Sequence, residues 1–187
     1  IRNPGGLWDD SMTLYPAFGS RPVSGPLEHI FPSGARVKFA GMEHADDRFA
    51  WDGAQIPLIG FDQLEHFERV QFFYMLSRNR SMCGVPPYVR ATCNPDPDSW
   101  LADFIAWWID PDTGFPIPSR SGVIRWFLNL DDKLIWADTR EELFERFRIK
   151  DLPADDEKQP QPLSVTFIPG TIYDNQALLA KDPQYLA

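Results

Sequence analysis

The sequence predicts a mixed α/β fold, and three observations indicate it. The short apolar run 56–61 lacks polar alternation, which is typical of a parallel strand buried on both faces, and the run 88–93 predicts a second buried strand. Residues 63–80 lie between them, contain no Pro or Gly, and carry apolar side chains at helical spacing. A second helical stretch, residues 99–109, follows the second run. The order strand, helix, strand, helix is the pattern of an α/β sheet with crossover helices.

The elements before the first of these strands are expected to be short. Residues 1–27 are rich in Gly, Pro and Ser, and we expect them to be irregular apart from a short helix near residues 7–15. Residues 29–40 predict a hairpin that turns at Ser33-Gly34. The acidic stretch 43–52 is expected to be a loop.

Beyond residue 110 the pattern becomes antiparallel. Residues 123–130 and 133–137 flank Asp131-Asp132 and predict a hairpin. Thr139 predicts the N-cap of a helix over residues 139–148, with Glu142 as its capping-box partner. An acidic linker over 151–162, a strand over 163–168 and a helix over 175–187 are expected to follow. We expect one domain over residues 1–187, in which residues 110–160 form a hairpin, helix and linker subregion.

The composition excludes some classes of protein. The net charge of −9 argues against a broad nucleic-acid-binding face but permits a motor that grips DNA through a few loops. No apolar run approaches the roughly 18 residues that a membrane span needs, and no signal peptide is visible. Two cysteines, Cys83 and Cys93, are too few for a disulfide framework and favour a reducing compartment.

The first candidate site is the acidic residue that closes the first apolar strand. Asp62 lies where open α/β sheets bind ligands, and in P-loop ATPases an Asp at this place holds Mg²⁺. Gln63 follows; its side chain can orient a water molecule but cannot take its proton. In such ATPases the residue after the Asp is often a Glu that polarises the attacking water, and Glu65 is a candidate substitute for it here. The alternative is that Asp62 only caps the helix that follows.

The second candidate site is the polar segment at the end of the second apolar strand. If the two strands are neighbours, Thr92 and Asn94 lie near Asp62, where uncharged polar groups can sense a γ-phosphate. The alternative is a simple turn, since Asn-Pro starts turns. Arg48, in the loop before the first strand, is a candidate arginine finger or else a solvated loop residue.

Two further groups of residues are weaker candidates. A cluster of aspartates could form a two-metal nuclease site, although each also fits a turn or a helix end: Asp96, Asp98, Asp103, Asp110 and Asp112. The three histidines share no metal-ligand spacing and are expected at the surface: His29, His44 and His66.

These segments together resemble the large subunit of bacteriophage terminases. Residues 39–43 resemble a family strand that ends in Gly and an acidic residue, and residues 52–63 resemble the Walker B region. Residues 71–80 are similar to the helix that follows it. The most specific likeness is Thr92-Cys93-Asn94-Pro95 leading to Trp100, which resembles the coupling motif of the family. Residues 167–170, 174–175, 178 and 185–186 resemble the segment that joins the ATPase to the nuclease.

The resemblance implies a partial P-loop NTPase sheet of the RecA/ASCE-like kind, using ATP and Mg²⁺. It implies that Asp62 holds Mg²⁺, that Gln63 occupies the place of the catalytic acid, and that Thr92 and Asn94 couple hydrolysis to movement. It also implies Arg48 as a finger acting on a neighbouring subunit. The implied partners are double-stranded DNA, the portal protein, the small terminase subunit and other copies of the chain, with no membrane, in the host cytoplasm.

No Gly-rich loop ending in Gly-Lys-Ser or Gly-Lys-Thr occurs in residues 1–187, so we expect the Walker A loop upstream of Ile1 and a nuclease domain downstream. Without such a loop nothing neutralises the triphosphate, so the 187-residue chain alone is expected to be inactive. A different class of function stays open: a non-enzymatic interaction or assembly domain that binds a partner through the hairpin 123–137 and the aromatic helix expected over 99–109.

Overall fold

The computed structural model describes residues 1–147 and 161–181 and shows a mixed α/β protein with small parallel and antiparallel sheets. The described chain divides into two compact units, Ile1–Pro95 and Asp96–Ala187, each with its own buried residues. The expected linker at 151–162 and the end of the last expected helix lie almost wholly outside the described residues. The expectation of one domain over 1–187 stays a prediction.

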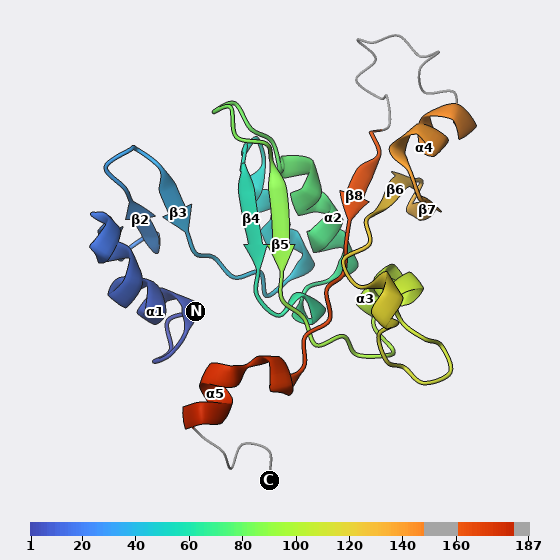
Figure 1. Cartoon of the computed structure of the whole chain (residues 1–187). Helices are drawn as coiled ribbons and strands as arrows, with labels where there is room; N and C mark the ends of the chain where they lie inside the picture. The colour runs from blue at the N-terminus through green and yellow to red at the C-terminus, as the bar shows by residue number, and fades with distance from the viewer. Residues whose placement is uncertain (148–160, 182–187) are drawn as a thin grey trace. The chain divides into compact units, whose positions relative to one another are not determined.

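The first unit opens with helix α1 (Leu7–Leu14), the 3₁₀ turn η1 (Tyr15–Phe18) and an antiparallel sheet (Figure 1). The strands are β1 (Arg21–Val23), β2 (Glu28–Ile30) and β3 (Arg36–Lys38), with β2 in the middle. The short helix and the β2–β3 hairpin are confirmed. Strand β1 was not expected, because residues 1–27 are rich in Gly, Pro and Ser; it lies at the edge of the sheet, where Pro22 is tolerated.

His29, on the central strand β2, is fully buried, so the expectation that it lies at the surface is wrong. Its ring packs against Trp8 and Tyr15, each with ring centroids 5.0 Å away. Nε2 lies 3.0 Å from the Ser11 hydroxyl and Nδ1 lies 2.9 Å from the Ser20 hydroxyl. Both ring nitrogens therefore have partners, which is what allows an imidazole to be buried here.

A parallel pair of strands forms the centre of the first unit. Strand β4 (Leu58–Phe61) and strand β5 (Tyr88–Ala91) lie side by side, with Leu58 opposite Tyr88 and Phe61 opposite Ala91 (Figure 1). The predicted parallel pairing is confirmed. The expectation that β4 is buried on both faces is wrong, because the strand alternates, with Ile59 and Phe61 buried. The expectation that β5 is buried is also wrong.

Helix α2 (Arg69–Arg78) accounts for this one-sided burial. Phe72 of α2 packs on Phe61 of β4 with ring centroids 5.5 Å apart. Leu58, on the other face of the pair, is half exposed. A short apolar run does not show whether one or both faces of a strand are covered, which is why burial of both faces was wrongly expected.

The connection between β4 and α2 also differs from expectation. The sequence predicts a single helix over 63–80, but residues Leu64–His66 form a 3₁₀ turn, η3, and α2 begins only at Arg69. Gln63 adopts a left-handed backbone conformation with φ 57°, which no α-helix permits. A second start signal follows, because Glu68 and Gln71 form a capping box at the head of α2.

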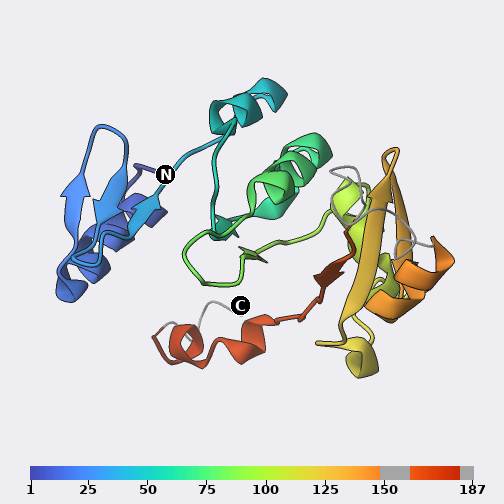
Figure 2. The ribbon, with the colours of Figure 1, turned by 90° about the horizontal axis from the view of Figure 1, so that it is seen from above.

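The second unit is an antiparallel sheet covered by helices on both faces. The strands β6 (Arg125–Leu130), β7 (Lys133–Ala137) and β8 (Leu163–Val165) have the order β7-β6-β8. On one face Phe104 of helix α3 (Trp100–Ile105) packs on Phe127 and Trp136. On the other, Leu143 of helix α4 (Arg140–Arg146) packs on Leu128 and Ala137, and Figure 2 shows α4 beside β6 and β7.

The predicted elements of this unit are confirmed in type and shortened in length. The hairpin at 123–137 is present as β6 and β7, and Asp131 and Asp132 both take positive φ in its turn. The helix expected over 99–109 is divided in two: α3 forms its first part, and the 3₁₀ turn η4 (Ala106–Trp108) follows directly. The Thr139 hydroxyl caps α4 by accepting from the Glu142 amide, while the Glu142 carboxylate accepts from Asp138 N–H. Helix α5 covers Gln176–Lys181.

Candidate active site at the end of the parallel strands

The carboxyl ends of β4 and β5 bring two of the predicted site residues into direct contact. The hydroxyl of Thr92 donates a hydrogen bond of 2.9 Å to Oδ1 of Asp62. The expectation that these two side chains meet at the strand ends is confirmed. The contact follows from the parallel register, because Asp62 and Thr92 each come directly after the last paired residues, Phe61 and Ala91.

The same hydroxyl also holds the backbone after Asp62. Thr92 Oγ1 accepts a hydrogen bond of 3.0 Å from Gln63 N–H, while its own proton goes to Asp62. Two backbone bonds extend the strand pairing around it: Thr92 N–H donates to Phe61, and Leu64 N–H donates to the Thr92 carbonyl. We call the atoms of Asp62, Gln63 and Thr92 joined in this way the strand-end clamp.

The clamp gives Gln63 an unusual position for a residue with a side chain. Its φ of 57° and ψ of 64° lie in the left-handed region, which Gly adopts readily and other residues rarely. Such a conformation costs about 1–3 kcal/mol and persists only where the surroundings impose it. The Thr92 hydroxyl and the two backbone bonds supply that constraint at this site.

Asp62 fits the role of a cation-holding carboxylate. It is exposed, and its hydrogen bond within the described part of the chain uses Oδ1. Mg²⁺ prefers oxygen ligands, keeps several waters, and is usually held through one or two carboxylates together with substrate phosphates. No group of three or more acidic, His or Cys side chains that could cage a metal occurs among the described residues. A single carboxylate such as Asp62 could hold such a cation only together with ligands from another molecule.

Glu65 lies in η3, two residues after Gln63 of the clamp. One of its carboxylate oxygens, Oε2, is shielded from solvent and has no hydrogen-bond partner among the described residues. Cys93, the residue after Thr92, is close enough to respond: burial and then the negative charge of Glu65 raise the pKa of its thiol.

The remaining predicted residues are not joined to the clamp by a hydrogen bond within the described ranges. Asn94 is exposed and makes no such bond to Asp62 there. Arg48 lies in the 3₁₀ turn η2 (Ala45–Trp51), donates to the Ala45 carbonyl and to Asp46, and stacks over Phe49 at 4.2 Å. The predicted loop at 43–52 is therefore an ordered turn, and its Arg is held by neighbours rather than extended into solvent.

Two polar residues of the α2 region, which no motif marks, hold backbone segments around the parallel strands, away from the clamp. Gln71 is buried, donates 2.9 Å to the carbonyl of His44 and so ties the segment before η2 to α2. Asn79, just past the end of α2, donates to the carbonyls of Ile56, Pro57 and Tyr88 at 2.8, 3.1 and 3.3 Å. The sequence signal that could have identified Gln71 as buried is its position as a polar residue within the apolar face of a helix.

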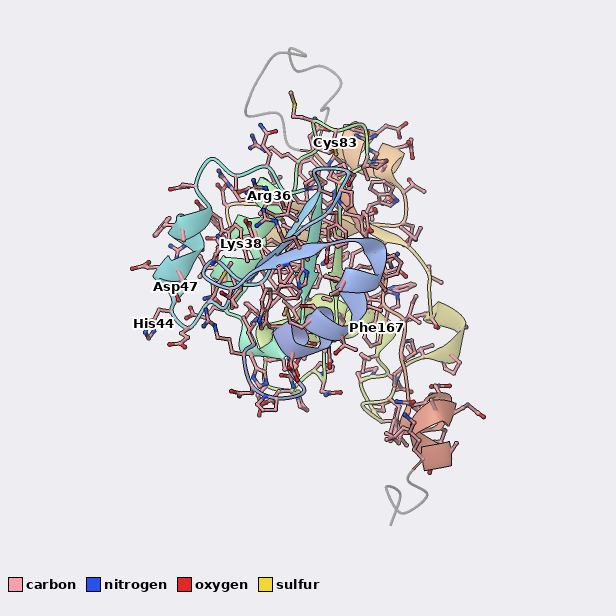
Figure 3. All side chains as sticks on the ribbon, turned by 90° about the vertical axis from the view of Figure 1, so that its left-hand side faces the viewer. Arg36, Lys38, His44, Asp47, Cys83 and Phe167 are labelled. Carbon is pink, nitrogen blue, oxygen red and sulfur yellow. The ribbon has the colours of Figure 1, made fainter. Side chains whose placement is uncertain are left out.

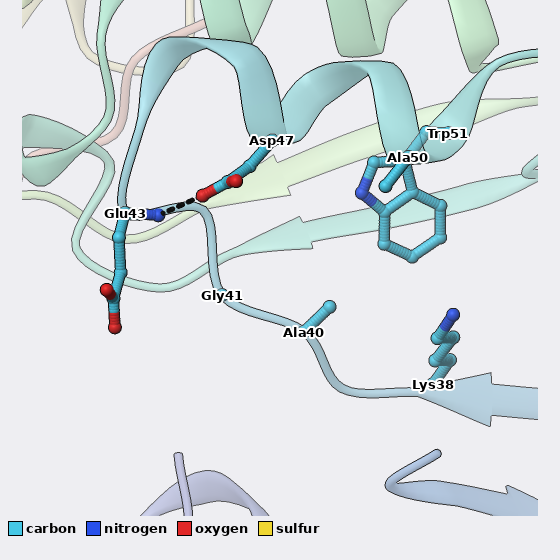
Figure 4. Close-up of a pocket in the computed structure, with 7 residues that line it drawn as sticks. All are labelled: Lys38, Ala40, Gly41, Glu43, Asp47, Ala50 and Trp51. Carbon is cyan, nitrogen blue, oxygen red and sulfur yellow. Dashed lines mark hydrogen bonds between the residues drawn. The ribbon is translucent and has the colours of Figure 1, made fainter.

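A separate hollow with a volume of about 390 Å³ lies between β3 and η2 (Figure 4). Lys38 covers the Trp51 ring at 4.9 Å, while Asp47 accepts hydrogen bonds from the amides of Glu43 and His44. Those bonds, that from His44 first, hold the pKa of Asp47 below its usual range. Figure 3 shows His44 and Asp47 close together at the start of η2. None of the predicted site residues lines this hollow.

Two aspartates of the alternative nuclease site, Asp96 and Asp110, accept hydrogen bonds from nearby backbone amides, as turn residues do. Asp96 accepts from the amide of Asp98 at 3.0 Å, and Asp110 accepts from the amide of Asp112 at 2.9 Å. Both cysteines are free, with Cys83 exposed in the loop between α2 and β5 (Figure 3). No helix in the described residues is both long and apolar enough to cross a membrane.

Comparison with known proteins decides the family. Residues 17–186 match the family model described as terminase large subunit, T4likevirus-type, N-terminal. The chain belongs to this family of terminase large subunits. The searches of curated proteins and of solved structures returned no match. The family drives phage DNA packaging and is an ATPase family.

Proposed function

We propose that this terminase chain contributes the cation-binding and γ-phosphate-sensing edge of an ATPase site that drives double-stranded DNA into a procapsid. The observation that carries the proposal is the hydrogen bond between Thr92 and Asp62 at the ends of two parallel strands. Ligands of open α/β sheets bind at the carboxyl ends of the strands, where the clamp lies. The fold that we propose for the complete ATPase is a P-loop NTPase of the RecA/ASCE-like kind.

In this proposal each residue of the clamp has its own task. Asp62 holds Mg²⁺ through its water shell, and the ion, when bound, neutralises charge that develops on the phosphates. Gln63 donates or accepts hydrogen bonds that orient the attacking water. Thr92 keeps Asp62 and Gln63 in place, and Thr92 and Asn94 pass the loss of the γ-phosphate to the segment that follows β5.

The phosphate-binding loop is the part of the site that residues 1–187 do not supply. They contain no Gly-Lys-Ser or Gly-Lys-Thr loop. Backbone amides and a Lys of such a loop neutralise the triphosphate in P-loop ATPases. We therefore propose that the 187-residue chain by itself neither hydrolyses ATP nor binds it tightly, and that turnover requires a subunit that includes this loop.

The proposed partners follow from the family: double-stranded DNA, the portal protein, the small terminase subunit and other copies of the chain, in the host cytoplasm. Arg48 as a finger on a neighbouring subunit is part of the same proposal. Its guanidinium would have to leave the Ala45 carbonyl and Asp46 to reach a phosphate.

The test is ATP hydrolysis by the terminase large subunit that contains these residues. Asp62→Asn keeps the size of the side chain and removes its charge, so we expect Mg²⁺-dependent turnover to fall by about 100-fold or more. Asp103→Asn, in the second unit, is the matched control and should leave turnover unchanged. Full activity of the Asp62 variant, or strong turnover by the 187-residue chain alone, would contradict the proposal.

A further inference from the structure

Gln63 follows Asp62 in the proposed site, so the position after the cation-holding Asp has no carboxylate that could accept a proton from water. Gln63 can hold a water molecule by hydrogen bonds, but a neutral amide cannot accept its proton. Glu65 is the next carboxylate along the chain, in the 3₁₀ turn that starts at Leu64. The turn is held against β5, because Leu64 N–H donates 2.8 Å to the Thr92 carbonyl. Glu65 therefore lies on a segment whose position the clamp fixes.

The surroundings of Glu65 set it apart from a solvated surface carboxylate. The side chain is partly exposed, so water reaches it, yet Oε2 is shielded and receives no hydrogen bond from the described residues. A shielded carboxylate oxygen without a donor is less favourable than one that is hydrogen-bonded. An acceptor left open at a functional edge can be satisfied by a proton or by a bound ligand.

We propose that Glu65 is the catalytic base of this terminase, taking over the proton-accepting task that Gln63 cannot perform. The inference rests on the proposed ATPase function. Gln63 holds the water, and the water oxygen forms a bond to the γ-phosphorus while the bond from that phosphorus to the β–γ bridging oxygen breaks. The water proton goes to the Glu65 carboxylate, the bridging oxygen leaves with ADP, and the proton then passes to solvent.

The proposal differs from a mechanism in which Gln63 alone orients the water and no side chain takes a proton. In that mechanism Glu65 has no chemical task, and its charge is dispensable. If Glu65 is the base, moving a carboxylate to position 63 should replace it. The two mechanisms therefore predict opposite results for the same pair of substitutions.

The experiment uses the terminase large subunit that contains these residues, with Glu65→Gln, Glu65→Asp and the double variant Gln63→Glu/Glu65→Gln. Loss of a general base lowers kcat by about 100- to 10,000-fold, and we expect Glu65→Gln to fall in that range. Its affinity for a fluorescent ATP analogue should stay within about threefold, because binding does not use the base. Nucleotide recovered from the Glu65→Gln protein after mixing with labelled ATP should be ATP rather than ADP.

The remaining variants separate the outcomes. We expect the double variant to recover at least about tenfold of the lost kcat, and Glu65→Asp to keep part of it. Glu145→Gln, an exposed residue of α4, is the matched control. If Asp62→Asn abolishes turnover while Glu65→Gln keeps it within about threefold, the assignment of Glu65 is overturned and the proposed function stands. If Asp62→Asn keeps full turnover, the proposed function itself fails.

Discussion

The Thr92 hydroxyl shows how much a single side chain decides in this protein. It donates a hydrogen bond to Asp62 and accepts one from the Gln63 N–H, so both groups depend on one oxygen atom. Charge-assisted hydrogen bonds of this kind, from a neutral donor to a carboxylate, are stronger than neutral ones. Position 92 therefore accepts few replacements, although the residue is exposed.

Thr92→Val removes the hydroxyl and keeps the branched shape of the side chain. We expect kcat of the ATPase to fall by about 10- to 100-fold, because Asp62 and Gln63 lose their common partner. Thr92→Ser keeps the hydroxyl and should retain most of the activity. Steady-state ATP hydrolysis by the intact subunit measures both. Equal activities for the Val and Ser variants would show that the hydroxyl is not needed.

His29 is a buried residue whose position likewise depends on single hydroxyl groups. The Ser11 hydroxyl donates 2.7 Å to the Trp8 carbonyl, so it must accept from Nε2–H of His29. The Ser20 hydroxyl then donates to Nδ1. Sequence reasoning could not find this network, because a His in a short run of mixed residues has no periodic signature.

Ser11→Ala should leave the Nε2–H of His29 buried without a partner. We expect the free energy of unfolding to fall by about 1–3 kcal/mol, measured by urea denaturation of the 187-residue chain. Ser24→Ala changes an exposed serine in the turn between β1 and β2 and serves as the control. A loss at Ser11 no larger than at Ser24 would contradict the role assigned to the network.

At the scale of elements, the sequence predicts which segments pair but not how they end. The parallel pairing of β4 and β5, the hairpin of β6 and β7 and the cap of α4 at Thr139 were all predictable from local pattern and turn chemistry. The late start of α2 was not, since it depends on the left-handed conformation of Gln63, and Thr92, 29 residues away, holds that conformation. Tertiary contacts of this kind override local propensity.

Asn79 is the element-scale counterpart of the clamp, at the opposite end of the two strands. Its amide donates to carbonyls that lead into both β4 and β5. Asn79→Ala should lower the free energy of unfolding by about 1–2 kcal/mol. Asn79→Asp should cost more, because a carboxylate would face three carbonyl oxygens. Urea denaturation measures both, and an Asp variant as stable as the parent would refute this account.

At the scale of the whole molecule, two sets of buried residues belong to two units. Ile59, Phe61, Phe72 and Met75 are buried in the first unit, while Leu128, Ala137 and Leu143 form a core cluster in the second. Composition alone could not reveal this division, since both units are rich in aromatic residues and no long linker separates them at Pro95.

Separate cores predict separate melting. We expect calorimetry of the 187-residue chain to show two transitions, and Leu143→Ala to lower only one of them, since large-to-small changes in a core cost about 2–5 kcal/mol. Leu58→Ala, a half-exposed position, is the control for a general effect of truncation. A single transition that shifts as a whole with Leu143→Ala would indicate one cooperative domain, as the sequence predicts.

The parallel pairing has one more consequence for evolution and for engineering. The clamp extends the pairing of β4 and β5 past their last paired residues. The positions of the Asp62 and Thr92 side chains relative to each other therefore depend on the register of the two strands. A shift of the register by one residue would turn the Thr92 hydroxyl to the opposite face of the sheet. Asp62 would then lose the hydrogen bond that holds its carboxylate. Insertions or deletions within residues 58–62 or 88–92 should therefore leave the overall secondary structure intact and yet abolish the ATP hydrolysis that we propose for this site.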